Sequence, residues 1–351
     1  MRYTTFGRRT GLRVSEFALG TANFGTLWGG GATKSEARKV FERFADAGGT
    51  LIDTADNYQI GESEKLLGEF LAADRDHFVV TSKFSLGAGR ARISSTGNSR
   101  KNIRVSVEAS LKRLRTDHLD LYWAHLPDEV TPVEEVLTAL DDLVRDGKIL
   151  HAGLSNFPAW RVSRAATIAE LRGWAPLVGV QFEYSLAERG ADRELLPMAE
   201  ALGLGSALWS PLGGGMLTGK YRHSREGRLS DWDGLAIRQE DSEQRTAVLD
   251  AVLAVAEETG RSAVQVAIGW LRAKAARSTT AMVPVIGPRT VDQLDEYLAA
   301  LDLALDDAQV ARLDEVSAIR PGQPYELIAG HRDTVLGVED GRFIRPATPV
   351  A

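Results

Sequence analysis

The chain of 351 residues is 44% hydrophobic, so it is long enough to bury one large core or two smaller ones. Its 42 basic and 48 acidic side chains give a net charge of −6, which argues against nucleic acid or an anionic membrane as its main partner. It has no cysteine, which excludes disulfides, thiolate metal sites and cysteine nucleophiles, and no apolar segment reaches the roughly 20 residues needed to cross a bilayer.

Short apolar or β-branched runs alternate with amphipathic helical patterns from residue 16 to residue 300. This alternation is typical of parallel strands joined by crossover helices. Two helix starts carry a predicted capping box, Thr33 with Glu36 and Thr131 with Glu134, and each precedes apolar residues at helical spacing. The first of these helices is expected to end at Gly48.

The sequence predicts eight strands. They are residues 17–20, 51–53, 78–83, 119–125, 150–155, 178–181, 206–209 and 282–286. Because the spacing between strands stays near one strand-helix unit, the pattern favours an α/β fold of the closed (β/α)₈ TIM-barrel type over an open, doubly wound sheet. We expect one barrel domain over residues 1–351.

Three segments depart from the repeating unit. Residues 2–15 alternate polar and apolar positions around Gly7 and Gly11, which predicts an N-terminal β-hairpin that plugs the barrel floor. A long insertion follows the seventh strand, and its polar part from Arg222 to Gln244 is expected to serve a site, for instance as a lid. Beyond residue 318 the periodicity is lost, and we expect the tail, 318–351, to pack over the barrel or its mouth.

Polar residues end three consecutive strands, where a barrel of this type carries its catalytic groups. Asp53 ends the second strand and is followed by Tyr58, Lys83 ends the third, and His125 ends the fourth. A phenol with a pKa of about 10 is a poor acid-base catalyst near neutral pH, but an adjacent ammonium is expected to lower that pKa by about one to three units. Asp53 would hold Lys83 charged, and a neutral His125 could donate a hydrogen bond to a substrate carbonyl oxygen.

These residues lie in segments that resemble the aldo-keto reductase family, in particular its branch of bacterial aryl-alcohol dehydrogenases and potassium-channel β subunits. The segments are 51–58, 61–64, 83, 120–125, 153–157, 181, 209–214, 217–221 and 286–293, in the family's order and over nearly the whole chain. The resemblance implies reversible NADPH-dependent reduction of small-molecule aldehydes or ketones to alcohols. It also implies a catalytic tetrad of Asp53, Tyr58, Lys83 and His125, with Tyr58 as general acid.

The resemblance also implies a binding site for NADPH or NADP+. The residues concerned are Gly20, Thr21, Asp53, Ser155, Asn156, Gln181, Trp209, Ser210, Pro211, Leu212, Gly214, Lys220, Gly287, Arg289, Thr290, Gln293 and Glu296. Asn156 and Gln181 offer the donors and acceptors that a carboxamide needs, and Trp209 offers a flat ring beside nicotinamide. Arg289, before a helix predicted from the pair Thr290 and Gln293, is expected to select NADPH through its 2′-phosphate.

Two positions differ from the family pattern, and two other functions are alternatives to carbonyl reduction. Tyr297 stands where the family often has an adenine-contacting Asn, and Leu126 stands where it often has a Trp in the substrate wall. One alternative is a non-catalytic or slow NADPH-sensing subunit of a larger assembly. The other is a barrel hydrolase that uses carboxylates, which would have no use for Asn156 and Gln181. We expect no metal site, because His118 and His125 have no evident third ligand, and we expect a cytoplasmic location. The oligomeric state is left open.

Overall fold

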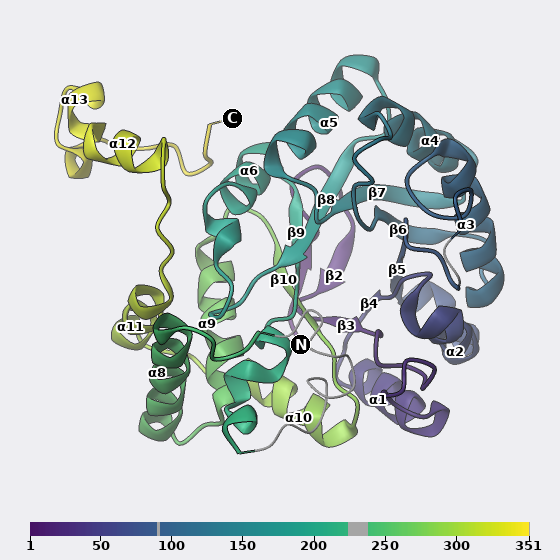
Figure 1. Cartoon of the computed structure of the whole chain (residues 1–351), viewed down its shortest axis with the longest axis horizontal. Coiled ribbons are helices and arrows are strands. Elements are labelled where there is room, and N and C mark those ends of the chain that lie inside the picture. Colours follow the sequence, from purple (N-terminus) through teal and green to yellow (C-terminus); the bar gives the residue numbers. More distant parts are fainter. Residues whose placement is uncertain (90–91, 224–237, 351) are drawn as a thin grey trace.

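Eight parallel strands close into a barrel with helices around it, which confirms the predicted (β/α)₈ fold (Figure 1). The computed structural model describes residues 1–89, 92–223 and 238–350. The strands are β3 (Ala18–Gly20), β4 (Leu51–Asp53), β5 (Val79–Phe84), β6 (Leu119–Ala124), β7 (Ile149–Ser155), β8 (Leu177–Glu183), β9 (Gly205–Trp209) and β10 (Met282–Ile286). Each strand follows its neighbour around the barrel, and β10 pairs with β3 to close it. The observed strand bounds differ from the predicted ranges by at most two residues.

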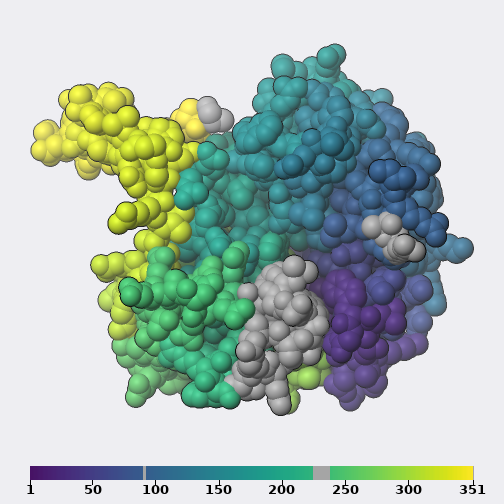
Figure 2. Space-filling view, viewed as in Figure 1, coloured from purple at the N-terminus to yellow at the C-terminus, as the bar shows by residue number. Residues whose placement is uncertain are grey.

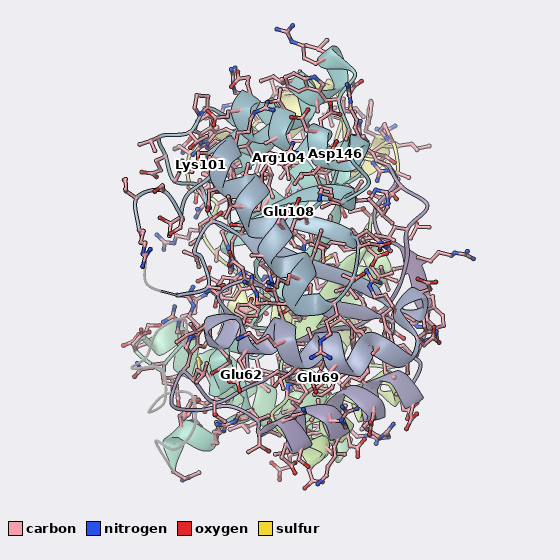
Figure 3. The ribbon with its side chains drawn as sticks, turned by 90° about the vertical axis from the view of Figure 1, so that its right-hand side faces the viewer. Glu62, Glu69, Lys101, Arg104, Glu108 and Asp146 are labelled. Atoms are coloured by element: carbon pink, nitrogen blue, oxygen red, sulfur yellow. The ribbon has the colours of Figure 1, made fainter. Side chains whose placement is uncertain are left out.

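Helices cover the outside of the barrel and bury apolar side chains against the strands or, as in α8 and α11, against one another. They are α1 (Lys34–Asp46), α2 (Glu62–Phe70), α3 (Arg100–Leu114), α4 (Val133–Arg145), α5 (Ala159–Arg172), α6 (Leu195–Leu202), α8 (Glu243–Thr259), α9 (Ala263–Arg277), α10 (Val291–Ala299) and α11 (Asp307–Ser317). Their outer faces are charged. Figure 3 shows Arg104 of α3 beside Asp146 at the end of α4, and the two side chains form an ion pair of 3.0 Å.

The inside of the barrel is a packed apolar layer closed from below by the N-terminal hairpin. The hairpin strands β1 (Tyr3–Thr5) and β2 (Arg13–Ser15) pair antiparallel, as predicted. Phe6 follows β1 and packs edge-on against Trp123 of β6, with ring centroids 6.1 Å apart. Gly179 makes room for it, because a Cβ there would lie 2.4 Å from the Phe6 ring. The floor is therefore shaped by one aromatic ring fitted against a glycine.

The helix starts agree with the predicted capping boxes in part. At α1, the Thr33 side chain accepts a hydrogen bond from the Glu36 backbone N–H. The reciprocal bond of the predicted box is replaced, because the Glu36 carboxylate pairs with Lys39 one turn later at 3.0 Å. The helix ends as expected, since Gly48 adopts a positive φ of 83°.

The predicted cap of α4 is wrong. This helix begins at Val133, and Pro132 precedes it without a side-chain capping bond. Thr131 is used elsewhere, because its hydroxyl donates to an Asp128 carboxylate oxygen at 2.7 Å. Glu134 forms an ion pair with Arg164 of α5. Competing local partners therefore removed both halves of the expected box.

The tail does not pack over the barrel or its mouth, which corrects the expectation from the sequence. It contains two short helices, α12 (Tyr325–Gly330) and α13 (Arg332–Leu336), which project sideways from the barrel beyond α6 (Figures 1 and 2). Of the predicted polar lid from Arg222 to Gln244, residues 224–237 lie outside the described part, and Glu243 and Gln244 begin α8. None of the described helices has the length and apolar composition that a membrane span requires.

Candidate active site

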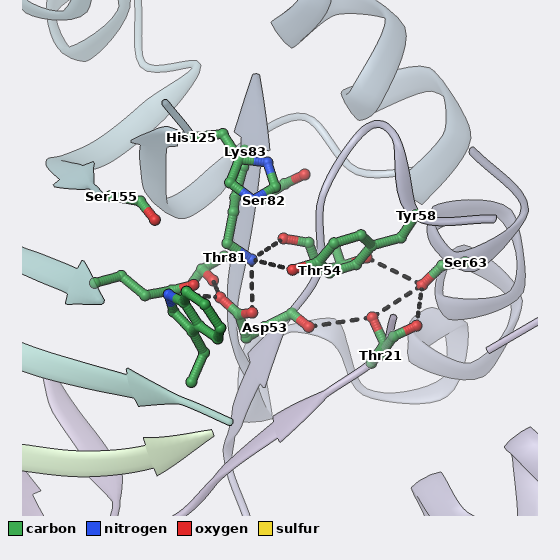
Figure 4. A network of polar contacts seen from close by, with 12 residues as sticks. Thr21, Asp53, Thr54, Tyr58, Ser63, Thr81, Ser82, Lys83, His125 and Ser155 are labelled. Atoms are coloured by element: carbon green, nitrogen blue, oxygen red, sulfur yellow. Dashed lines mark hydrogen bonds and ion pairs between the residues drawn. The ribbon is translucent and has the colours of Figure 1, made fainter. Parts of the chain in front are cut away.

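Strand alternation brings Asp53 and Lys83 to the upper end of the barrel interior. Leu51 of β4 and Val79 of β5 face the inner apolar layer, and residues at even spacing after them point the same way. Lys83 Nζ lies 2.6 Å from Asp53 Oδ2 and also donates to the Thr54 carbonyl oxygen at 2.8 Å (Figure 4). Lys83 is fully buried. Burial alone would lower the pKa of Lys83, but the negative charge of Asp53 and the hydrogen bonds to Asp53 and Tyr58 outweigh burial and raise that pKa. The lysine therefore stays an ammonium.

Tyr58 follows β4 in a strained turn and reaches the same ammonium. Gln59 and Ile60 adopt positive φ angles of 49° and 58° within this turn. Tyr58 Oη lies 3.1 Å from Lys83 Nζ. Burial raises the pKa of Tyr58, and the positive charge of Lys83 offsets this only in part. Lys83 thus acts in the expected direction, but burial outweighs it, so the net pKa is raised and Tyr58 holds its proton at neutral pH.

His125 faces Tyr58 from the end of β6, with the two ring centroids 6.0 Å apart and nearly perpendicular. Its Nδ1 is buried and has no hydrogen-bond partner among the described residues. Burial, together with the positive charge of Lys83, lowers the pKa of His125 to about 3. The imidazole is therefore neutral at physiological pH and can offer one N–H without carrying a charge.

A network of side-chain hydrogen bonds that involves two amides joins the next three strands, β7, β8 and β9. Asn156 follows β7 with a φ of 59°, and its Nδ2 donates to the His125 carbonyl oxygen and to Ser155 Oγ, both at 3.0 Å. Trp209, at the end of β9, donates from its indole N–H to Asn156 Oδ1 at 3.0 Å. Gln181 of β8 donates to Asp53 Oδ1 at 2.8 Å. These bonds fix the amide groups and leave acceptor capacity on Asn156 Oδ1.

A cavity of about 1050 Å³ opens at this end of the barrel, at the upper limit of ordinary ligand sites. The predicted residues that line it are Gly20, Asp53, Tyr58, His125, Asn156, Gln181, Trp209, Ser210, Pro211, Leu212, Gly214, Lys220, Gly287, Arg289, Gln293 and Glu296. Lys83, Thr21, Ser155 and Thr290 are not in its wall. Lys83 lies directly behind Tyr58, Ser155 supports Asn156, and Thr21 bonds to the Asp53 carbonyl oxygen and to Ser63.

The far part of the cavity has two features that fit the phosphates of a dinucleotide. Gly213, Gly214 and Gly215 all have positive φ angles and form a tight turn after β9. The N-terminus of α10 faces the cavity through Arg289 and Gln293. Thr290 caps this helix through the Gln293 backbone N–H, while the Gln293 side chain accepts from the Arg289 backbone N–H at 2.8 Å. A helix N-terminus beside an arginine favours an anion.

Several lining residues were not singled out from the sequence. They are Ala22, Asn23, Asn57, Leu86, Gly215, Thr218, Val264 and Val285. Trp28 also lines the cavity, and it packs edge-on against Tyr58 with ring centroids 6.0 Å apart. Asn23 had a recognisable signal, because it follows β3, and its side chain ties this loop to β10 through the Gly287 carbonyl oxygen at 2.8 Å. Val264, on α9, had none.

Comparison with known proteins finds similarity to the aldo/keto reductase family and to oxidoreductases. A model of the aldo/keto reductase family matches residues 16–318. The chain is 35% identical to a norsolorinic acid reductase of Aspergillus flavus over 91% of this chain and 81% of that protein. It is 36% identical to the oxidoreductase YrpG of Bacillus subtilis, over 94% and 100%, and 35% identical to an NADP(+) aryl-alcohol dehydrogenase of Phanerodontia chrysosporium, over 92% and 88%. Among the described residues, no group of three or more His, Cys, Asp or Glu could hold a metal ion.

Proposed function

The chain belongs to the aldo/keto reductase family, and from this premise we propose that Asp53, Tyr58, Lys83 and His125 carry out its reaction. The enzyme is an NADP-dependent oxidoreductase that reduces aldehydes or ketones to alcohols. The observation that carries the proposal is the contact of Tyr58 Oη with the buried Lys83 ammonium at 3.1 Å, behind a cavity wall that contains Tyr58 and His125. We propose that residues 1–351 form a single barrel domain, in which residues 318–351 are the C-terminal tail.

Tyr58 acts as the proton donor. Bound NADPH supplies a hydride to the carbonyl carbon, so negative charge builds on the carbonyl oxygen. Tyr58 gives its proton to that oxygen, and the Lys83 ammonium stabilises the phenolate that is left. Asp53 holds the ammonium in place at 2.6 Å. Neutral His125 donates a hydrogen bond to the same oxygen and orients the carbonyl.

The wall from β7 to α10 carries residues that fit a dinucleotide cofactor. Asn156 and Gln181 would hold the carboxamide, and Trp209 would offer its ring to the nicotinamide. The turn that contains Gly214 would leave room for the pyrophosphate, and Lys220 would add positive charge there. Arg289 would bind the 2′-phosphate at the N-terminus of α10. Ser155 and Thr21 support this site through Asn156 and Asp53.

The substrate lies between Tyr58 and the open side of the cavity. Trp28, Leu86 and Leu126 form that side of the wall, so it favours carbonyl compounds with an apolar substituent. Leu126 widens the site relative to a tryptophan at the same position. The enzyme is proposed to work in the cytoplasm without nucleic acid or membrane partners, in line with its net charge of −6 and its lack of cysteine.

The decisive experiment replaces Tyr58 by Phe. The purified enzyme is mixed with NADPH and a panel of small aldehydes and ketones, and the loss of NADPH absorbance is followed. We expect Tyr58→Phe to lose on the order of a thousandfold or more in kcat, within the range that general acid catalysis contributes, while it still binds NADPH. Tyr122→Phe is the matched control, because Tyr122 is also buried and its hydroxyl has no hydrogen-bond partner among the described residues.

The outcome separates the candidate functions. Turnover retained in Tyr58→Phe would contradict the assigned proton donor. Tight NADPH binding without oxidation across the whole panel, in the unaltered protein, would favour the cofactor-sensing subunit instead.

A further inference from the structure

The C-terminal tail is folded, yet none of its described residues from 318 to 350 is buried. Its root is fixed to the barrel near α6. Arg193 donates to the carbonyl oxygens of Pro321 and Arg320 at 2.9 and 3.2 Å, and the Tyr325 hydroxyl donates to Glu194. Beyond Tyr325, hydrogen bonds within the described chain join the tail only to itself. The tail therefore leaves the barrel from a firm attachment.

Residues 325–344, the tail arm from here on, have internal order but no core. The Asp340 backbone N–H donates to Asp333 at 2.8 Å, and Arg332 pairs with Asp340 at 3.4 Å. The helices α12 and α13 contain six and five residues. Isolated helices shorter than about 12 residues are marginal in water, and a unit without a core does not compensate for the lost chain entropy. The arm therefore needs a second surface to stay folded.

The arm offers an apolar surface to that partner. Its exposed apolar side chains are Leu327, Ile328, Val335, Phe343 and Ile344. Ile344 is 95% exposed and Val335 is 82% exposed. Residues 325–344 contain two arginines and four acidic residues, so the net charge of the arm is 2 − 4 = −2. This small negative charge disfavours an acidic partner, and the five exposed apolar side chains require an apolar surface to cover them.

The barrel carries such a surface beside its substrate cavity. Exposed apolar side chains project from the loops after β3, β4, β5 and β6, which are neighbouring strands. This mouth cluster consists of Leu27, Ile60, Leu86, Ile93, Leu126 and Val130. Leu86 and Leu126 also line the cavity. Grouped exposed apolar side chains of this kind mark an interaction site.

The arm of a chain does not cover the mouth cluster of the same chain. In Figures 1 and 2 the helices of the arm project beyond α6, whereas the loops after β3 and β4 lie on the opposite side of the barrel. No residue beyond Tyr297 lines the cavity in the described part of the chain. One chain thus carries two exposed apolar surfaces that it cannot bring together by itself.

We propose that the tail arm docks on the mouth cluster of a second copy of this chain, and that the second copy returns the contact. Such an exchange satisfies the two surfaces at once and is a closed, twofold arrangement, the commonest form among homo-oligomers. The arm has about 20 residues, comparable with one side of a specific interface. Because Leu86 and Leu126 belong to both the cluster and the cavity wall, the partner's arm completes the entrance of the substrate site.

Disulfide trapping tests the contact directly, because the chain has no cysteine of its own. Ile344→Cys is mixed with Leu27→Cys or with Leu126→Cys under oxidising conditions, with a tag on one chain. We expect a disulfide that joins one chain of each kind. Ile344→Cys mixed with Val105→Cys is the control, because Val105 is exposed on the outer helix α3, and we expect no comparable product. Linkage to neither mouth residue, or equal linkage to Val105→Cys, would overturn the proposal.

The mass in solution gives an independent test. We expect the unaltered protein to sediment as a dimer or a larger multiple, and Ile344→Asp to sediment as a single chain that still binds NADPH. Val105→Asp should keep the mass of the unaltered protein. A monomeric unaltered protein, or an Ile344→Asp variant of unchanged mass, would overturn the proposal. So would an intrachain disulfide in the double variant Ile344→Cys, Leu27→Cys, since it would show that the arm folds back on its own barrel.

Discussion

Asp56, two residues before Tyr58, is a buried carboxyl group with an unusual environment. Its Oδ1 has no hydrogen-bond partner among the described residues. Burial, with a further contribution from the negative charge of Glu64, raises the pKa of Asp56 to about 7, and Arg113 offsets this only in part. Glu64 is itself buried and bonded to Ser82 and Arg113. Two carboxyl groups therefore share one guanidinium beneath the catalytic turn.

This pKa makes the stability of the enzyme depend on the charge of Asp56. In the unfolded chain Asp56 releases its proton near its ordinary pKa of 3.8, while the folded chain keeps it until about pH 7. Folding therefore loses stability as the pH rises through this window, by on the order of 4 kcal/mol above pH 7. We expect Asp56→Asn to raise the free energy of unfolding more at about pH 8 than at about pH 5, by roughly 2.5 kcal/mol.

Chemical unfolding at the two pH values measures this difference. Asp302→Asn is the control, because Asp302 is exposed at the protein surface. This variant should change the free energy of unfolding by the same small amount at both pH values. An Asp56→Asn effect that does not vary with pH would contradict the shifted ionisation.

Arg289 should decide between the two nicotinamide cofactors. It lies at the N-terminus of α10, and a charged hydrogen bond to a phosphate contributes about 1.5 to 3 kcal/mol. We expect Arg289→Ala to weaken NADPH binding roughly 10- to 100-fold and to leave NADH binding nearly unchanged. Arg161→Ala is the matched control, since Arg161 of α5 lies over the Phe157 ring and outside the cavity wall. Titration of both cofactors measures the effect, and equal losses would place the 2′-phosphate elsewhere.

For single residues, the sequence predicts which side chains lie together but not how burial changes their pKa values. Asp53, Lys83 and His125 end neighbouring strands, so alternation alone brings them to one end of the barrel. The pKa of His125, about 3, depends on burial by loops that are distant in sequence. For the same reason the raised pKa of Tyr58 was not predicted, because the spacing of residues reports the nearby ammonium but not the loss of water.

At the scale of elements, the junction between α1 and β4 depends on a close glycine contact. Phe44, in the last turns of α1, is fully buried. A Cβ at Gly49 would lie 2.2 to 2.5 Å from three atoms of the Phe44 ring. Gly49 has an ordinary backbone conformation, so the constraint is one of space alone. Gly48 therefore ends the helix through its positive φ, and Gly49 leaves space for the Phe44 ring.

We expect Gly49→Ala to lower the free energy of unfolding by about 1 to 3 kcal/mol, because a buried ring has to move. In a Phe44→Val background the same change should cost much less, since the ring atoms it would strike are gone. Thermal unfolding of the two single variants and the double variant measures this coupling. Gly11→Ala is the control, because a Cβ there meets no atom within 4 Å. If the effects of Gly49→Ala and Phe44→Val on the free energy of unfolding simply add in the double variant, the predicted contact between the two positions is wrong.

Strand periodicity and glycine stops are local signals, so the strand ranges of the barrel are predicted within two residues. Caps are less predictable. Thr131 resembles a cap in sequence, but Asp128 competes for its hydroxyl. Such competition depends on the geometry of the preceding turn, which a spacing rule does not contain.

At the scale of the whole molecule, the barrel is predictable because each strand-helix unit buries its apolar face only when the ring of strands is closed. The tail is not predictable in this way. Its apolar residues neither repeat at helical spacing nor face the chain's own core, so the sequence records that they are apolar but not which surface covers them.

The barrel floor provides the last prediction, because it separates stability from activity. Phe6 is 1% exposed and fills the space left by Gly179 under Trp123. Phe6→Ala leaves a cavity there and should lower the free energy of unfolding by about 3 to 5 kcal/mol. Since the catalytic end of such a barrel lies opposite its floor, kcat and KM of the folded enzyme should not change. Thr4→Ala, exposed on the same hairpin, controls for the loss of a side chain. A Phe6→Ala variant with unchanged unfolding midpoint but lower kcat would show that the plug shapes the site rather than the core.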